Sequence, residues 1–127
     1  MHFSAVISAA AALLLLGSSV HAADKEGNYA VWGMGNQSCH AYNKARAGAE
    51  GEADTFKYYV MGYLTAYNVH QSETYSISSA TPMPDIMVWL DEFCDSHAVS
   101  SFETALKNFI SEHFEGRMKT IPRKFAR

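Results

Sequence analysis

The chain has 127 residues and a formal net charge of −3 at neutral pH. All 13 acidic residues lie at or before Glu115 with only five basic residues, a balance of −8. The other five basic residues follow without an acid: Arg117, Lys119, Arg123, Lys124 and Arg127. We expect residues 117–127 to form a basic tail, either solvated or folded back on the acidic body, and we expect no nucleic-acid partner.

Residues 1–22 resemble a cleavable signal peptide. The run from Ala5 to Leu16 is apolar apart from Ser8 and is too short to span a bilayer. The following Val20-His21-Ala22 resembles a cleavage site. We therefore expect cleavage after Ala22, export, and no membrane contact by the remaining chain.

The chain has two cysteines, Cys39 and Cys94. Cysteines of exported proteins pair by default, so we predict one disulfide that encloses the segment between them. Closing a loop of this length stabilises a fold by about 4 kcal/mol in the chain-entropy model. Together with His40 and His97, the cysteines could alternatively supply four zinc ligands. Adjacent Cys-His is poor chelating geometry, and we expect no metal and no cofactor.

The first half of the chain predicts an arm and two helices. Residues 23–37 read as an irregular arm whose Trp32 packs onto the helices. Ser38 is a suitable N-cap for a helix from Cys39 to about Ala47. The next helix, from Asp54 to Asn68, can be capped by Asp54 or Thr55, and we expect Gly62 within it to admit a close neighbour. Its apolar stripe has helical spacing and comprises Phe56, Tyr59, Val60, Tyr63, Leu64 and Tyr67.

The second half predicts a long loop and two more helices. Residues 69–83 lack periodicity, and Tyr75 and Ile77 are expected to pin them to the core. A third helix starts at Thr81-Pro82 or Pro84-Asp85, because proline is accepted in a first turn. Its stripe is Ile86, Trp89, Leu90, Phe93, Cys94 and His97.

Ser100-x-x-Glu103 matches a capping box for a fourth helix ending near Gly116. Its stripe is Phe102, Leu106, Phe109, Ile110, His113 and Phe114. The prediction is an all-α fold: a small four-helix domain over residues 38–116, with one disulfide and a long loop between the second and third helices.

No catalytic motif is present in the sequence. There is no nucleophile elbow, no His-Glu-x-x-His and no phosphate loop. Asp91, Glu92 and Asp95 have the spacing of a solvated outer helix face. We do not expect an enzyme. His97 and His113 fall on or beside apolar stripes and read first as packed or capping residues, but either could act as a pH sensor.

The central helix has more tyrosines than one buried stripe can absorb. Tyr58 would lie off the buried face, with Met61 beside it. One interpretation is partial burial under the long loop. The other is an apolar surface for protein binding, for which the candidate residues are Tyr58, Met61, Tyr67, Tyr75 and Ile77.

The order of these features resembles the HdeA/HdeB family of periplasmic acid-stress proteins. The matching positions are Cys39, Tyr42, Gly62, Tyr63, Ala66, Asn68 and Cys94, followed by an aromatic-containing last helix with Phe102 and Phe109. The resemblance spans residues 38–114. It implies a periplasmic, chaperone-like protein with an HdeA-like domain, dimeric near neutral pH, that loosens in strong acid and holds unfolding client proteins.

The arm with Trp32, the long loop and the basic tail depart from that family. The helix with Trp89, Leu90 and Phe93, followed by His97 and Ala105, also resembles helical periplasmic immunity proteins against type VI secretion amidases. This likeness implies an alternative function, in which the 69–83 loop plugs a secreted effector enzyme.

Overall fold

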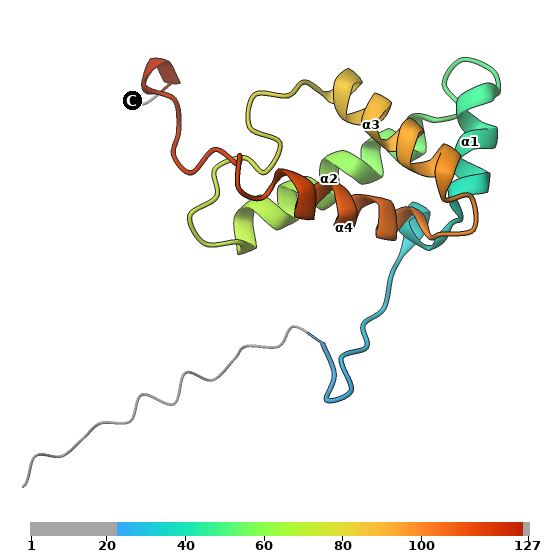
Figure 1. Ribbon diagram of the computed structural model, residues 1–127, viewed down its shortest axis with the longest axis horizontal. Helices are drawn as coiled ribbons and strands as arrows, with labels where there is room; N and C mark the ends of the chain where they lie inside the picture. Colours follow the sequence, from blue (N-terminus) through green and yellow to red (C-terminus); the bar gives the residue numbers. More distant parts are fainter. Residues whose placement is uncertain (1–22, 126–127) are drawn as a thin grey trace, which may run out of the picture. The chain divides into compact units, whose positions relative to one another are not determined.

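The computed structural model describes residues 23–125 (Figure 1). It forms four α-helices: α1 (Cys39–Ala47), α2 (Asp54–His70), α3 (Met83–Ser96) and α4 (Phe102–His113). Two short 3-10 helices, η1 (Gly33–Asn36) and η2 (Arg123–Phe125), precede and follow them. The described residues contain no strand, only two isolated bridges. The all-α, four-helix prediction is confirmed, whereas the expected signal peptide lies outside the described residues.

The described residues divide into two units between Ala30 and Val31. In the first, the Asp24 carboxylate accepts hydrogen bonds from the backbone N–H groups of Asn28, at 2.7 Å, and Glu26, at 3.0 Å. The bond from Asn28 holds the pKa of Asp24 below its ordinary value. This unit is thus a small turn closed on its own aspartate.

The helical unit is built around the predicted disulfide. Cys39 and Cys94 are bonded, with their Cα atoms 4.9 Å apart, and both are fully buried. The bond joins the first residue of α1 to the last turn of α3. Backbone hydrogen bonds from Cys39 N to Ser100 O and from His40 N to Ala98 O, at 2.8 and 2.9 Å, hold α1 against the turn before α4. The disulfide prediction is confirmed.

Three aromatic rings from three helices form the centre of the core. Tyr42 of α1 lies 5.3 Å from Phe56 of α2 and 4.7 Å from Phe102 of α4, measured between ring centroids, and the last two are 5.0 Å apart. The apolar stripe of α2 faces this cluster: Phe56, Val60 and Leu64 are buried, and Tyr59, Tyr63 and Tyr67 are half-buried. The predicted stripe is therefore confirmed.

The helix starts agree with the sequence only in part. Ser38 caps α1 as predicted, its hydroxyl accepting from Ala41 N at 3.1 Å. At α4 the cap is Ser101, not Ser100, because the Ser101 hydroxyl accepts from Thr104 N at 3.2 Å. The prediction that Asp54 or Thr55 caps α2 is wrong, since Ala53 occupies that position without a side-chain bond.

Residues 71–82 connect α2 to α3, and Val69 and His70 belong to α2. Ile77 is only 1% exposed, and its backbone N–H donates to Asn68 Oδ1 at 2.8 Å. Ile77 therefore pins the connection to the core, and its assignment to a binding surface is wrong. Its side chain belongs to the buried hydrophobic core.

Two further expectations about packing are wrong. Trp32 does not pack onto the helices, because its side chain is 82% exposed. Gly62 admits no close neighbour, since a Cβ placed there would meet nothing within 4 Å. The close approach to a glycine occurs instead at Gly35 of η1, which the Tyr59 side chain contacts from α2.

Among residues 23–125, no helix has the length and apolarity needed to cross a membrane.

The two glycines give a matched test of the packing. Gly62→Ala should raise the free energy of unfolding by about 0.5–1 kcal/mol, because it replaces glycine by the best helix former at an open position. Gly35→Ala should lower it by about 1–3 kcal/mol, because the new Cβ overlaps the Tyr59 hydroxyl. Urea unfolding of both variants measures the difference. Equal effects would contradict the structure.

Candidate functional site

A groove of about 580 Å³ lies between α2 and α3, and we call it the methionine groove. It is lined by Arg46 of α1, by Lys57 and Met61 of α2, and by four residues at the start of α3: Met83, Pro84, Met87 and Val88. Unbranched, polarisable methionine side chains adapt to ligands of different shape. This lining is typical of a surface that accepts varied apolar side chains.

The groove exists because of how α3 packs. α3 lies most closely against α1 and α4, so its first turns leave a channel toward α2. Proline starts α3 without cost because an N-terminal N–H has no helical partner. Met87 turns inward and is 4% exposed, whereas Val88 is 51% exposed at the rim. Met61 faces them from α2 and is 46% exposed.

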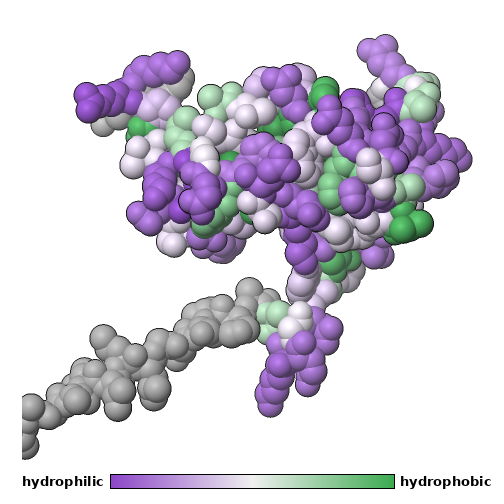
Figure 2. All heavy atoms as spheres, in the orientation of Figure 1, coloured by the Kyte–Doolittle hydropathy of each residue, from purple (hydrophilic) through white to green (hydrophobic). Residues whose placement is uncertain are grey.

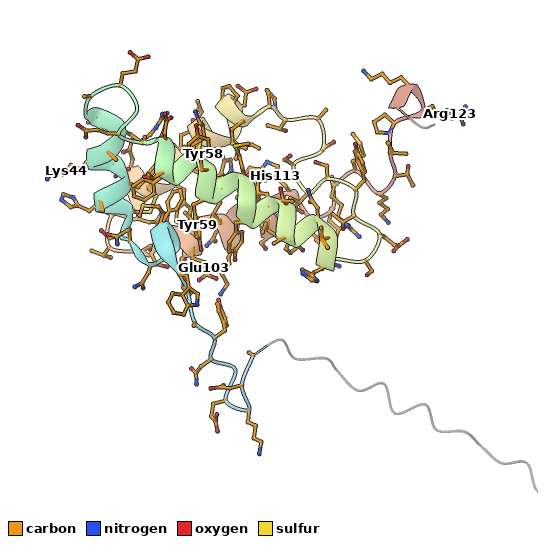
Figure 3. The ribbon with its side chains drawn as sticks, turned by 180° about the vertical axis from the view of Figure 1, so that it is seen from behind. Lys44, Tyr58, Tyr59, Glu103, His113 and Arg123 are labelled. Atoms are coloured by element: carbon orange, nitrogen blue, oxygen red, sulfur yellow. A yellow bond between two sulfur atoms is a disulfide. The ribbon has the colours of Figure 1, made fainter. Side chains whose placement is uncertain are left out.

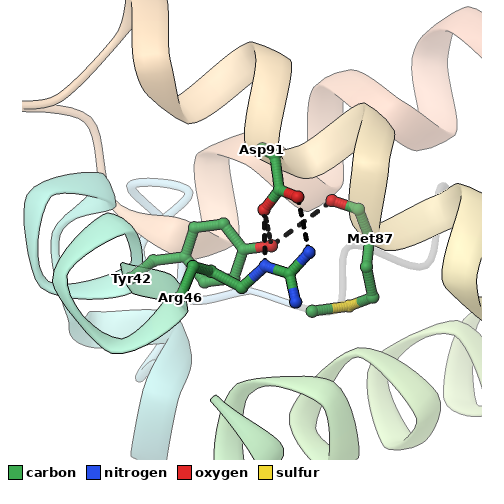
Figure 4. Close-up of polar contacts among 4 residues, drawn as sticks. All are labelled: Tyr42, Arg46, Met87 and Asp91. Atoms are coloured by element: carbon green, nitrogen blue, oxygen red, sulfur yellow. Dashed lines mark hydrogen bonds and ion pairs between the residues drawn. The ribbon is translucent and has the colours of Figure 1, made fainter. Parts of the chain in front are cut away.

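A hydrogen-bonded ion pair closes the α1 end of the groove (Figure 4). Arg46 donates two hydrogen bonds to Asp91, from Nε at 2.7 Å and from Nη2 at 2.6 Å. The Tyr42 hydroxyl donates to Asp91 at 2.6 Å and lies 3.3 Å from Met87 O. We call Tyr42, Arg46 and Asp91 the latch. It ties α1 to α3 and fixes the guanidinium beside Met87.

The latch controls the charge states of its members. Burial, followed by the hydrogen bond to Asp91, raises the pKa of Tyr42 well above its ordinary value. The hydrogen bond to Asp91 likewise raises the pKa of Arg46. The phenol therefore stays neutral and the guanidinium charged. The sequence prediction that Asp91 belongs to a solvated outer face is wrong: Asp91 is half-buried, while Glu92 and Asp95 are exposed.

One residue of the predicted binding surface lines this groove, and a second lies nearby on the same helix. Met61 lines it, and Tyr58, which is 63% exposed, lies one helical turn before Met61 on α2. Figure 3 shows Tyr58 on α2, where it points away from the core. The Lys57 ammonium lies 5.5 Å from the Tyr58 ring centroid and 3.0 Å from Asp54 Oδ1.

The other predicted surface residues lie elsewhere. Tyr67 lines a second groove, of about 680 Å³, between α2 and α4, with Tyr63, Ile110 and Phe114 among its neighbours. Partial burial raises the pKa of Tyr67. Tyr75 is 46% exposed on the connection between α2 and α3. The structure thus separates the predicted surface into two grooves and a loop.

The two histidines proposed as pH sensors end their helices. His97 Nδ1 lies 2.8 Å from Phe93 O, and its ring stacks on Phe93 at 4.2 Å. His113 makes the same contacts with Phe109, at 2.8 and 4.1 Å. Neither lines the methionine groove. Both match the packed or capping interpretation, and a sensing role stays a prediction.

The alternative zinc site fails because the two cysteine sulfurs are bonded to each other. Within residues 23–125, no group of three or more His, Cys, Asp or Glu side chains could hold a metal ion.

Sequence reasoning missed Met83, Met87 and Val88. Met83 and Met87 are four residues apart, a spacing that places both on one side of a helix. The stronger aromatic stripe of the same helix concealed this second stripe.

Comparison with known proteins identifies no relative of this chain. No protein-family model, no curated protein and no solved structure matches it.

Asp91→Asn tests the latch. It should lower the free energy of unfolding by about 1–2 kcal/mol, because it replaces charge-assisted hydrogen bonds in a half-exposed site. The matched control is Asp95→Asn, one turn further along α3 at an exposed position, which should change stability by no more than about 0.5 kcal/mol. Urea unfolding measures both. A control as destabilising as Asp91→Asn would contradict the latch.

Proposed function

We propose that the protein binds exposed apolar segments of other proteins in the methionine groove. The observation that carries the proposal is the coincidence of Met61, Met83 and Met87 with the exposed Val88 at one groove. Unfolding proteins expose varied apolar side chains, and a methionine lining can repack around them. The function is therefore that of a chaperone-like binding protein and not of an enzyme.

The disulfide supports export, because such bonds persist in oxidising compartments. With the resemblance of residues 38–114 to HdeA/HdeB proteins, we propose a periplasmic role in the stress response, with a homodimer near neutral pH. Client proteins are the partners, and nucleic acid is not.

The latch and the disulfide both join α1 to α3. One link is ionic and the other is covalent, and together they hold Arg46 at the wall of the methionine groove. The resemblance of residues 38–114 to HdeA/HdeB proteins supplies the proposed trigger, which is strong acid.

Two valines provide the test. Val88→Lys places a charge at the groove rim, and Val99→Lys places it at a position that is 98% exposed and outside the groove. A lysine ammonium stays charged in acid. We expect Val88→Lys to abolish most of the suppression of aggregation of an acid-unfolded model enzyme at about pH 3, since moving a charge from water into an apolar contact is unfavourable. Val99→Lys should retain it. Light scattering measures the aggregation.

An absence of suppression by the unaltered protein would contradict the function, and equal loss in both variants would contradict the site.

The alternative, inhibition of a secreted effector through residues 69–83, is favoured by the left-handed backbone at Glu73 (φ 50°) and Ser79 (φ 54°). Strained positions of this kind are enriched at functional sites. That alternative predicts stoichiometric binding of one effector, lost in Tyr75→Ala and retained in Val88→Lys.

A further inference from the structure

The chain leaves the helical unit as a basic extension with an anchored base. Met118 forms a bridge with Ser76, with Met118 N donating to Ser76 O at 2.8 Å and Ser76 N to Met118 O at 3.0 Å. Arg117 Nε donates to Thr74 Oγ1 at 3.0 Å, and its guanidinium lies 3.9 Å from the Phe114 ring centroid. These contacts fix where the extension starts.

Beyond this anchor, the side chains are directed outward. Lys119, Ile121, Arg123 and Lys124 are all exposed, Ile121 by 43%. Figure 1 shows this segment standing off from the helices, and Figure 2 shows the same extension as mainly hydrophilic. Within residues 23–125, neither Lys119 nor Arg123 forms an ion pair with the acidic body. The tail is thus not folded back onto that body through these two charges.

The basic tail lies at one end of the helical unit. Figure 3 places Arg123 at the opposite end of the helical unit from Lys44 of α1. Every acidic residue precedes the tail, and Glu115 is the last of them. An anionic surface would therefore repel the body and attract only this end. The charge distribution gives the molecule one orientation toward such a surface.

We propose that residues 117–125 of the tail dock the protein on membranes that contain anionic phospholipids. Ile121 and Pro122 lie between the basic residues Lys119 and Arg123, and this mixture suits the boundary between headgroups and acyl chains. Basic residues close to an anionic membrane each add to its affinity. The disulfide indicates an oxidising compartment, where membranes are common partners and nucleic acids are not. This docking replaces the sequence-based expectation of no membrane contact and is independent of the methionine groove.

The test uses residues 23–127 and two charge-matched double variants. Vesicles of phosphatidylcholine with about 30% phosphatidylglycerol should bind the protein at low salt, and pure phosphatidylcholine vesicles should not. Lys119→Gln with Arg123→Gln should weaken binding about 25-fold, from about fivefold for each charge. Lys25→Gln with Lys44→Gln removes the same charge elsewhere and should weaken it less than about twofold. Co-sedimentation measures the partition coefficients.

Circular dichroism checks that each variant retains its helices, which we expect because all four substituted residues are exposed. Binding that disappears at high salt would support the proposal. No binding to the anionic vesicles, or equal weakening in both double variants, would overturn it. Tighter tail-dependent binding to a duplex oligonucleotide under the same conditions would also overturn it, in favour of nucleic acid.

Discussion

The structure depends on the covalent bond between Cys39 and Cys94. It joins the start of α1 to the end of α3 across a sequence separation of 55 residues. Because the intervening chain contains the whole of α2, the bond confines the central helix within a closed loop. A nine-residue helix such as α1 is too short to persist by itself. Its position therefore requires the disulfide, the buried ring of Tyr42 and the ion pair of Arg46 with Asp91.

The methionine groove follows from this arrangement. The disulfide and the latch hold α3 to α1, and the packing of Trp89 on Phe109, at 5.3 Å between centroids, holds α3 to α4. These contacts use two sides of α3 and leave its first turns open toward α2. Adaptable side chains occupy that opening, and Arg46 of the latch forms part of its wall. The ion pair of Arg46 with Asp91 thus connects the packing of α1 on α3 to the proposed binding site.

Local chemistry made much of the fold predictable. Residue spacing or a known residue preference was enough to predict three features: the Ser38 cap of α1, the stripe from Phe56 to Leu64 and the pairing of the two cysteines. Predictions that required knowledge of a neighbour were less successful. Gly62 has open space above it, whereas Gly35 contacts Tyr59, and nothing in either local sequence distinguishes the two. Likewise, Asp91 looks like part of a solvated face until the fold places Arg46 opposite it. For the methionine groove, the sequence predicted Met61 but not Met83, Met87 or Val88. These three were missed because α3 carries two stripes, and the aromatic one is the stronger.

The central claim is that apolar protein segments bind between α2 and α3, and methionine methyl NMR tests it most directly. Residues 23–127 contain five methionines: Met61, Met83 and Met87 at the groove, and Met34 and Met118 outside it. Titration with an unfolded, apolar client polypeptide should shift the three groove methyl signals in parallel and leave the other two in place. Shifts of Met34 or Met118 alone, with the groove signals unchanged, would contradict the account.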